Sequence, residues 1–306
     1  MKINSIMLAG AGAVGLSTAE AIYDYDPDCI SVLATGERLA RYRKNGLRIN
    51  GKKIDFRLTE GEKTDLIIIA CKFHHLNQVI KDIKSSVGKD TLIISLLNGI
   101  SSEEIIGKEL GRERLPLAMI LGTDALHGGE ETAYTRRGTV HFGEGQKNGE
   151  REERIAEFFS RSGVKYRLET DMKRVLWFKF MLNTGVNQVT AVLRLPYGCI
   201  MNKGGPAEIP EARELIERAM RETVTIANEE GIDLNENDIM AWYDTVNVLN
   251  PASYTSMCQD VLAKRKTEVE MFSLTLMELG KKHGIKLPVN ETLYLQIKTI
   301  EKSYGG

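Results

Sequence analysis

The sequence predicts an α/β protein in which an N-terminal domain built on a parallel sheet is followed by an all-helical C-terminal domain. Short apolar runs alternate with helical patterns in the first half of the 306 residues. A glycine-rich turn follows the first of these runs, and helical periodicity takes over after about residue 169. This alternation is typical of a sheet that carries helices on its faces. We therefore expect two domains, residues 1–169 and 170–306.

The expected strands are short and almost wholly apolar: 5–9, 29–33, 65–70, 91–97 and 117–121. Because such runs have no polar face, they favour a parallel sheet that is buried on both sides. Leu16–Tyr25 is expected to form the first helix. The Asn50-Gly51 pair predicts the turn of a small hairpin within residues 46–56. A second polar, glycine-rich excursion spans residues 127–149.

The second half has helical periods punctuated by glycine and proline. We expect helices over 171–193, 210–230, 235–248, 253–283 and 290–303. These long apolar helices are compatible with a homodimer, but a helical domain core explains them equally well.

Composition excludes several classes of protein. The net charge of −1 gives no basic field for nucleic acid or an anionic membrane, and no apolar stretch reaches the ~20 residues of a membrane span. Four cysteines stand far apart, which favours reduced thiols, and no signal peptide is recognised. The histidines, including the adjacent His74 and His75, lack metal-ligand spacing. We expect a cytoplasmic protein without a metal site.

Residues 10–15 form a G-x-G-x-x-G motif between the first expected strand and the first expected helix. The motif consists of Gly10, Ala11, Gly12, Ala13, Val14 and Gly15. Its first glycine makes the turn, the second lets a pyrophosphate approach the backbone, and the third allows close packing of helix on strand. In this position the motif predicts a Rossmann-type dinucleotide site rather than only a tight turn.

The residues after the second strand bear on the choice between NAD and NADP. An acidic side chain at this point accepts hydrogen bonds from the ribose 2′-hydroxyl of NAD, but here Thr35 and Gly36 come first. Arg38, and with it Arg41, can meet a 2′-phosphate, which favours NADPH. The alternative is that both arginines lie on the solvated face of the next helix.

Two polar residues follow other strands of the expected sheet. Lys72 comes after the strand over 65–70, and Asn98 follows the strand over 91–97. Ligands of open parallel sheets bind outside the carboxyl ends of the strands. We therefore expect Lys72 and Asn98 to join the glycine turn at one edge, although singly each can be an exposed lysine or an ordinary turn.

Lys179, Asn183 and Asn187 are spaced four residues apart in an otherwise apolar segment. This spacing places them on one stripe of a helix. A polar stripe among apolar residues is costly unless it faces a cleft or buried partners. A lysine in a partly desolvated cleft has a lowered pKa, which suits a general acid in carbonyl reduction. The alternative is an exposed stripe.

At this point the residues resemble the ketopantoate reductases, or 2-dehydropantoate 2-reductases, along nearly the whole chain. The resemblance rests on the ordered set of 10–15, Cys71-Lys72, Leu97-Asn98-Gly99, Arg137 to Gly143, Trp177-Phe178-Lys179, Asn183, Asn187, Ser256 to Asp260, Thr267-Glu268 and Gly284 to Pro288. It implies NADPH-dependent reduction of a 2-keto acid to a 2-hydroxy acid, as in pantothenate and coenzyme A synthesis.

The same resemblance implies roles for individual residues. It makes Lys179 the general acid and Glu268 the carboxylate that binds the substrate's hydroxyl side. Asn183 and Asn187 become contacts to the substrate hydroxyl, Ser256 and Asn98 anchor the substrate, and Lys72 contacts the cofactor. On one ideal helix Ser256 and Glu268 lie ~120° apart. Both can therefore reach one cleft only if Ser256 lies at or before the start of its helix.

Several positions depart from the family pattern. Thr35 stands where many members have arginine, His75 and Leu97 stand where glutamine is frequent, and Phe272-Ser273 replaces an Asn-Gly pair. These changes leave open a 2-hydroxyacid dehydrogenase with another substrate. A protein of a different class, a nucleotide-binding sensor without catalysis, predicts cofactor binding without turnover.

Overall fold

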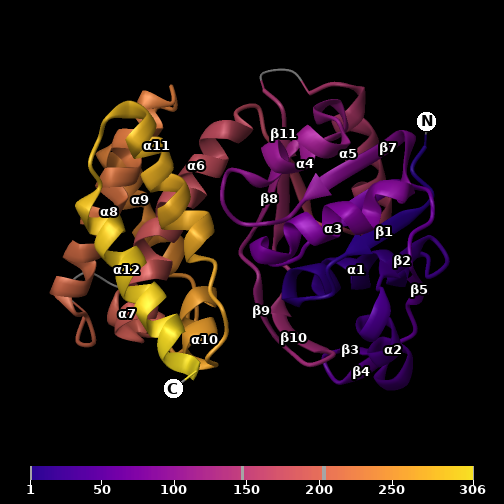
Figure 1. The fold of residues 1–306 in the computed structure, drawn as a ribbon, viewed down its shortest axis with the longest axis horizontal. Coiled ribbons are helices and arrows are strands. Elements are labelled where there is room, and N and C mark those ends of the chain that lie inside the picture. Colours follow the sequence, from indigo (N-terminus) through magenta and orange to yellow (C-terminus); the bar gives the residue numbers. More distant parts are fainter. Residues whose placement is uncertain (1, 146–147, 202–204, 306) are drawn as a thin grey trace. The chain divides into compact units, whose positions relative to one another are not determined.

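The computed structural model describes residues 2–145, 148–201 and 205–305, and its elements are labelled in Figure 1. The chain divides into two compact units, Met1–Lys173 and Arg174–Gly306. Each unit is described by itself.

A five-stranded parallel sheet forms the centre of the N-terminal unit. Its strands are β1 (Ile6–Ala9), β2 (Ile30–Leu33), β5 (Arg57–Thr59), β6 (Thr64–Ile69) and β7 (Val87–Ser95), in the order β5-β2-β1-β6-β7. Successive residues of β1 enter different cores, Ile6 and Leu8 on one face and Met7 and Ala9 on the other. Both faces are therefore buried, and the predicted parallel-sheet domain followed by a helical region is confirmed.

Helices cover the two faces of this sheet. Those of the N-terminal unit are α1 (Ala13–Tyr25), α2 (Gly36–Asn45), α3 (Leu76–Ile83), α4 (Ser102–Leu110) and α5 (Glu150–Ser162). Residues of α1, α2 and α5 share one core, and residues of α3 and α4 share the other. The arrangement can be followed in Figure 1.

The strand expected over 117–121 exists, but its assignment to the parallel sheet was wrong. β8 (Leu117–Leu121) pairs antiparallel with β11 (Thr139–Gly143), which also pairs with β12 (Tyr166–Leu168). The apolar residues predicted the strand correctly. They could not reveal its pairing partner β11, which lies later in the chain. The fifth parallel strand is instead β5, whose three residues run from exposed to buried and give little sequence signal.

The predicted hairpin is present and belongs to a third sheet. β3 (Leu47–Ile49) and β4 (Lys52–Ile54) are joined by Asn50 and Gly51, both with positive φ. β3 pairs in parallel with β10 (Glu131–Arg136), which pairs antiparallel with β9 (Asp124–Gly128). The hairpin and the second excursion therefore form one four-stranded sheet, in the order β4-β3-β10-β9.

The C-terminal unit consists of helices. They are α6 (Met172–Leu182, which begins in the N-terminal unit), the π-helix η4 (Asn183–Asn187), α7 (Gln188–Leu193), α8 (Pro210–Glu229), α9 (Glu236–Val246), α10 (Ser256–Leu262), the π-helix η6 (Glu270–Leu274), α11 (Thr275–His283) and α12 (Pro288–Lys302). Short 3₁₀ turns occupy Phe73–His75, Lys84–Ser86, Arg112–Arg114, Tyr197–Cys199 and Ser303–Gly305.

Two expected helices are interrupted, which corrects the sequence prediction. The segment 171–193 contains the π-helix η4, which packs against α8. A Cβ on Gly185 would lie 2.7 Å from Met220 Cγ, so this glycine permits the close approach. The segment 253–283 breaks after Leu262, where Lys264 has φ 52, and η6 begins at Glu270. Helical periodicity persisted across both interruptions and so did not reveal them.

Within the described parts of the chain, no helix combines the length and apolar character needed to cross a bilayer.

Candidate active site

The glycine turn after β1 is held by close backbone contacts. Gly10 has φ +120, and a Cβ there would lie 2.5 Å from the carbonyl carbon of Ala70. A Cβ on Gly15 would lie 1.9 Å from the carbonyl oxygen of Gly10. Around Gly12, by contrast, a Cβ would meet nothing within 4 Å. The first and last glycines therefore close the turn, while the middle one borders open space.

The start of α1 has the features of an anion site. Gly12 is its N-cap residue, no side chain caps the helix there, and its first turn contains no acidic residue. The first N–H groups of a helix have no partner within the helix and carry a partial positive charge. A pyrophosphate bound next to Gly12 therefore suits the free backbone N–H groups at the start of α1. Ala11, Ala13 and Val14 belong to the same turn.

The register of the sheet brings the expected polar residues to the same edge. Ala9 of β1 aligns with Ile69 of β6, and Ile69 aligns with Ser95 of β7. Gly10, Lys72 and Asn98 therefore follow the carboxyl ends of three adjacent strands. The order of the strands changes direction between β1 and β6, which is where open α/β sheets bind ligands.

The structure places Arg38 and Arg41 on exposed positions of α2. Thr35 is the N-cap residue of α2, and Gly36 has φ +54. Arg38 is exposed, and Arg41 forms an ion pair with Glu130 at 2.6 Å. Arg41 is therefore ion-paired, and Thr35 and Arg38 are the candidates that we retain for contact with the cofactor ribose.

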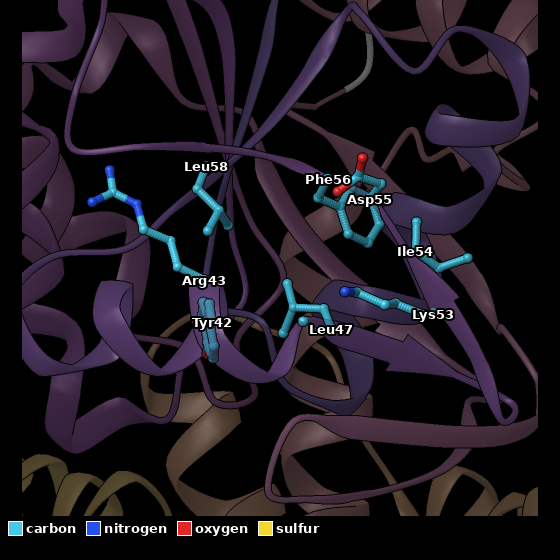
Figure 2. A pocket seen from close by; sticks show the side chains of 9 residues that line it. Tyr42, Arg43, Leu47, Lys53, Ile54, Asp55, Phe56 and Leu58 are labelled. Carbon is cyan, nitrogen blue, oxygen red and sulfur yellow. The ribbon is translucent and has the colours of Figure 1, made fainter.

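A cavity of about 220 Å³ lies in the N-terminal unit. Its walls come from the last residues of α2, the β3–β4 hairpin and the start of β5, including Tyr42, Arg43, Phe56 and Leu58 (Figure 2). Neither the glycine turn at residues 10–15 nor Lys72 or Asn98 lines this cavity, so it is distinct from the predicted dinucleotide site.

Lys179 is a lysine of the C-terminal unit whose pKa is strongly lowered. It lies near the end of α6 and is partly buried. Burial lowers the pKa of Lys179 to about 8, although the negative charge of Glu268 opposes that shift. A lysine with this pKa is an ammonium donor at neutral pH that can give up its proton readily.

Asn183 and Asn187 are the first and last residues of the π-helix η4. In an α-helix each fourth residue is rotated onward by about 40°, whereas the wider π turn rotates less per residue and so turns Asn187 back relative to that position. The amide Nδ2 of Asn183 is buried and has no hydrogen-bond partner among the described residues. Leaving such a donor unpaired costs about 1–3 kcal/mol, so a ligand acceptor fits here.

Ser256 and Glu268 are not on one helix, so the expected continuous helix was wrong. Ser256 is the exposed first residue of α10, directly after the N-cap residue Thr255. Glu268 is 7% exposed and precedes η6, which packs against η4. The break between α10 and η6 removes the 120° separation of a single helix. The structure thus brings Glu268 into electrostatic reach of Lys179.

Sequence reasoning missed a buried polar network behind these residues. Gln188, Ser273 and Asn290 are each fully buried and hydrogen-bonded to one another through Gln188. The only signal was a glutamine directly after Asn187 in an apolar segment.

No group of three or more histidine, cysteine, aspartate or glutamate side chains in the described ranges could hold a metal ion. The rings of His74 and His75 lie 4.2 Å apart.

The fold, together with the family models and relatives that match the chain, defines an oxidoreductase that acts on a CH–OH group. Residues 6–147 match the family model "Ketopantoate reductase PanE/ApbA", and residues 171–301 match "Ketopantoate reductase PanE/ApbA C terminal". The chain belongs to the ketopantoate reductase family, as the residue patterns indicated.

Relatives agree with this assignment over the full length of the chain. It is 27% identical to a 2-dehydropantoate 2-reductase of Pyrococcus horikoshii, covering 98% of this chain and 99% of the relative. A dimeric ketopantoate reductase from Staphylococcus aureus has a TM-score of 0.82 at 19% identity, covering 98% of this chain and 100% of the other. D-mandelate dehydrogenase, solved with NADH and anilino(oxo)acetate, has a TM-score of 0.85 at 24% identity, covering 98% and 99%.

Proposed function

We propose that the protein catalyses NADPH-dependent reduction of a 2-keto acid, with 2-dehydropantoate as substrate and pantoate as product in pantothenate and coenzyme A synthesis. The observation that carries this proposal is Lys179, whose pKa is lowered to about 8 next to a buried carboxylate. The names of the relatives and the family models support the choice of substrate.

In this proposal the N-terminal unit binds the cofactor, which supplies a hydride when bound. Gly10 and Gly15 hold the turn closed, Gly12 leaves room for the pyrophosphate, and the N–H groups at the start of α1 neutralise its charge. Lys72 and Asn98 contact the ligand at the neighbouring strand ends.

The C-terminal unit binds and protonates the substrate. Lys179 donates its proton to the carbonyl oxygen as charge develops there, and a pKa of about 8 keeps it protonated at neutral pH. Asn183 Nδ2 donates to a substrate oxygen, which satisfies the buried amide. Glu268, with Asn187 and Ser256, binds the hydroxyl side of the substrate and keeps Lys179 charged.

A second candidate is a 2-hydroxyacid dehydrogenase that uses NADH and another substrate. Thr35, which follows β2, favours this second candidate. Because its side chain is uncharged, it provides no positive charge to bind the 2′-phosphate of NADPH. The D-mandelate dehydrogenase neighbour, solved with NADH, supplies a precedent for such a change on this fold.

The test follows NADPH oxidation with 2-dehydropantoate and then with a panel of aliphatic and aromatic 2-keto acids, and repeats each assay with NADH. Rapid turnover with 2-dehydropantoate and NADPH supports the first candidate. Turnover with another keto acid or only with NADH supports the second. Cofactor binding without any turnover would overturn both and leave a nucleotide-binding sensor.

We also propose a homodimer, by analogy with the dimeric Staphylococcus aureus relative. Light scattering during size-exclusion chromatography should give twice the mass of one 34.2 kDa chain. A mass of one chain at assay concentration contradicts this proposal.

A further inference from the structure

The buried network of the C-terminal unit joins the two π-helices. Gln188 begins α7 directly after η4, and Ser273 lies within η6. Ser273 Oγ donates to Gln188 Oε1 at 2.5 Å, and Gln188 Nε2 donates to Asn290 Oδ1 at 3.1 Å. Asn290 Nδ2 donates in turn to Glu222 at 2.8 Å, so the chain of bonds ends on a carboxylate of α8.

Gln188 also compensates for the irregular backbone of η4. Its backbone N–H donates to the carbonyl of Gly185 rather than serving a regular α-helical turn. Its side-chain Nε2 donates to the carbonyl of Thr184 at 2.7 Å. A π turn replaces the usual four-residue bonding pattern, and the glutamine amide supplies a donor to a carbonyl inside that turn. The turn carrying Asn183 and Asn187 is therefore fixed by this side chain.

The other end of the network reaches the segment that follows Glu268. Ser273 stands five residues after Glu268, and η6 packs against η4. The Ser273–Gln188 hydrogen bond is thus a direct tie between the turn that carries the two asparagines and the segment that carries the carboxylate. Because all three network side chains are fully buried, water cannot replace a lost partner.

We propose that Gln188 and Ser273 are positioning residues that hold Asn183 and Asn187 at a fixed separation from Glu268, and thereby set recognition of the hydroxylated or carboxylated part of a 2-keto acid. This inference rests on the proposed function. Neither residue touches the reacting atoms; each acts through the π-helix to which it is bonded.

Stability alone does not account for such a network. Replacing both partners of a buried hydrogen bond by apolar groups of similar shape can be nearly neutral. A small displacement of binding groups, in contrast, changes substrate affinity strongly. A positioning role therefore predicts a loss that falls on the keto acid and spares the cofactor.

The experiment compares Ser273→Ala with Ser162→Ala. Ser162 is a buried serine of α5 whose hydroxyl donates to the carbonyl of Phe158 at 2.8 Å, so the chemical change is matched. We expect Ser273→Ala to raise KM for the keto acid roughly tenfold and to leave the dissociation constant of the nicotinamide cofactor unchanged. Ser162→Ala should leave both constants unchanged, even where its melting temperature falls equally.

Ser273→Thr retains the hydroxyl donor and should return KM toward the wild-type value. An active wild-type enzyme whose KM is unaltered by Ser273→Ala overturns the positioning role and leaves the proposed function intact. An equal rise of KM in Ser162→Ala also overturns it, because the effect is then one of stability. If the wild-type protein reduces no keto acid, the proposed function is wrong and this inference falls with it.

Discussion

The two units of the molecule position their proposed functional groups by different means. In the N-terminal unit the backbone does so: Gly10 and Gly15 shape a turn at which helix α1 presents its N–H groups. In the C-terminal unit side chains do so, on helices that depart from α geometry at Asn183–Asn187 and Glu270–Leu274. A backbone site requires glycines at fixed spacing and leaves a motif in the sequence. A side-chain site depends on where helices are interrupted, which tertiary contacts decide.

The largest expected effect tests the side-chain site. Lys179→Ala removes the proposed proton donor and should lower kcat for keto-acid reduction by about 10²-fold or more, with cofactor affinity unchanged. Lys173→Ala is the matched control, since Lys173 is an exposed lysine of the same helix. Steady-state assays give both values. Undiminished turnover in Lys179→Ala would exclude this lysine as the acid.

The corresponding change in the backbone site is Gly12→Val. The side chain fills the open space beside the helix N-terminus, so the dissociation constant of the cofactor should rise by about tenfold or more. Gly128→Val serves as control, because a Cβ on Gly128 of β9 also meets nothing within 4 Å. Fluorescence titration with NADPH measures the effect. Normal binding by Gly12→Val contradicts the assignment of this turn to the pyrophosphate.

A pH profile sharpens the comparison inside the C-terminal unit. The ammonium form of Lys179 exists below its pKa of about 8, so kcat/KM for reduction should decline as the pH rises through that value. The charge of Glu268 raises the pKa of Lys179, and Glu268→Gln should therefore move this decline to lower pH. Glu278→Gln, at an exposed position of α11, should not move it. A shift to higher pH would falsify the proposed pairing.

The smallest expected effect concerns cofactor choice in the N-terminal unit. Thr35→Arg places a cation at the end of β2 and should raise the preference for NADPH over NADH by several-fold, on the order of 1 kcal/mol. Ala40→Arg adds the same charge at an exposed position further along α2 and should not. The preference is measured as the ratio of the kcat/KM values for NADPH and NADH. An unchanged ratio shows that Thr35 does not face the 2′ position.

The parallel sheet and the glycine turn could be predicted from sequence because their signals are local. Apolar runs followed by glycine or by Lys72 and Asn98 define strand ends, and parallel topology then brings those ends together. The exception was 117–121, whose apolar residues say nothing about the antiparallel partner β11. Strand β5 was missed because three residues at a sheet edge carry no clear pattern.

In the C-terminal unit the helices were predictable and their interruptions were not. Helical spacing selected Lys179, Asn183 and Asn187, but it cannot distinguish an α turn from a π turn. The helix ends after Leu262, where Lys264 adopts a left-handed conformation. Only this interruption frees Glu268 from the helix of Ser256, and helical spacing does not predict it. The hydrogen bond from Ser273 to Gln188 joins residues 85 positions apart, which no local pattern encodes.

The sheet that contains the Asn50-Gly51 turn is assembled from strands far apart in the sequence, so it cannot be completed early in synthesis of the chain. The backbone N–H of Tyr134 donates to Asn50 Oδ1 across 84 residues, and β10 is the strand that pairs with β3. At typical ribosomal rates that stretch takes on the order of ten seconds to appear, during which a two-stranded hairpin is only marginally stable. Lys52 and Lys53, exposed on β4, place charge on the outer strand of this hairpin, and charged edge strands disfavour pairing with other chains.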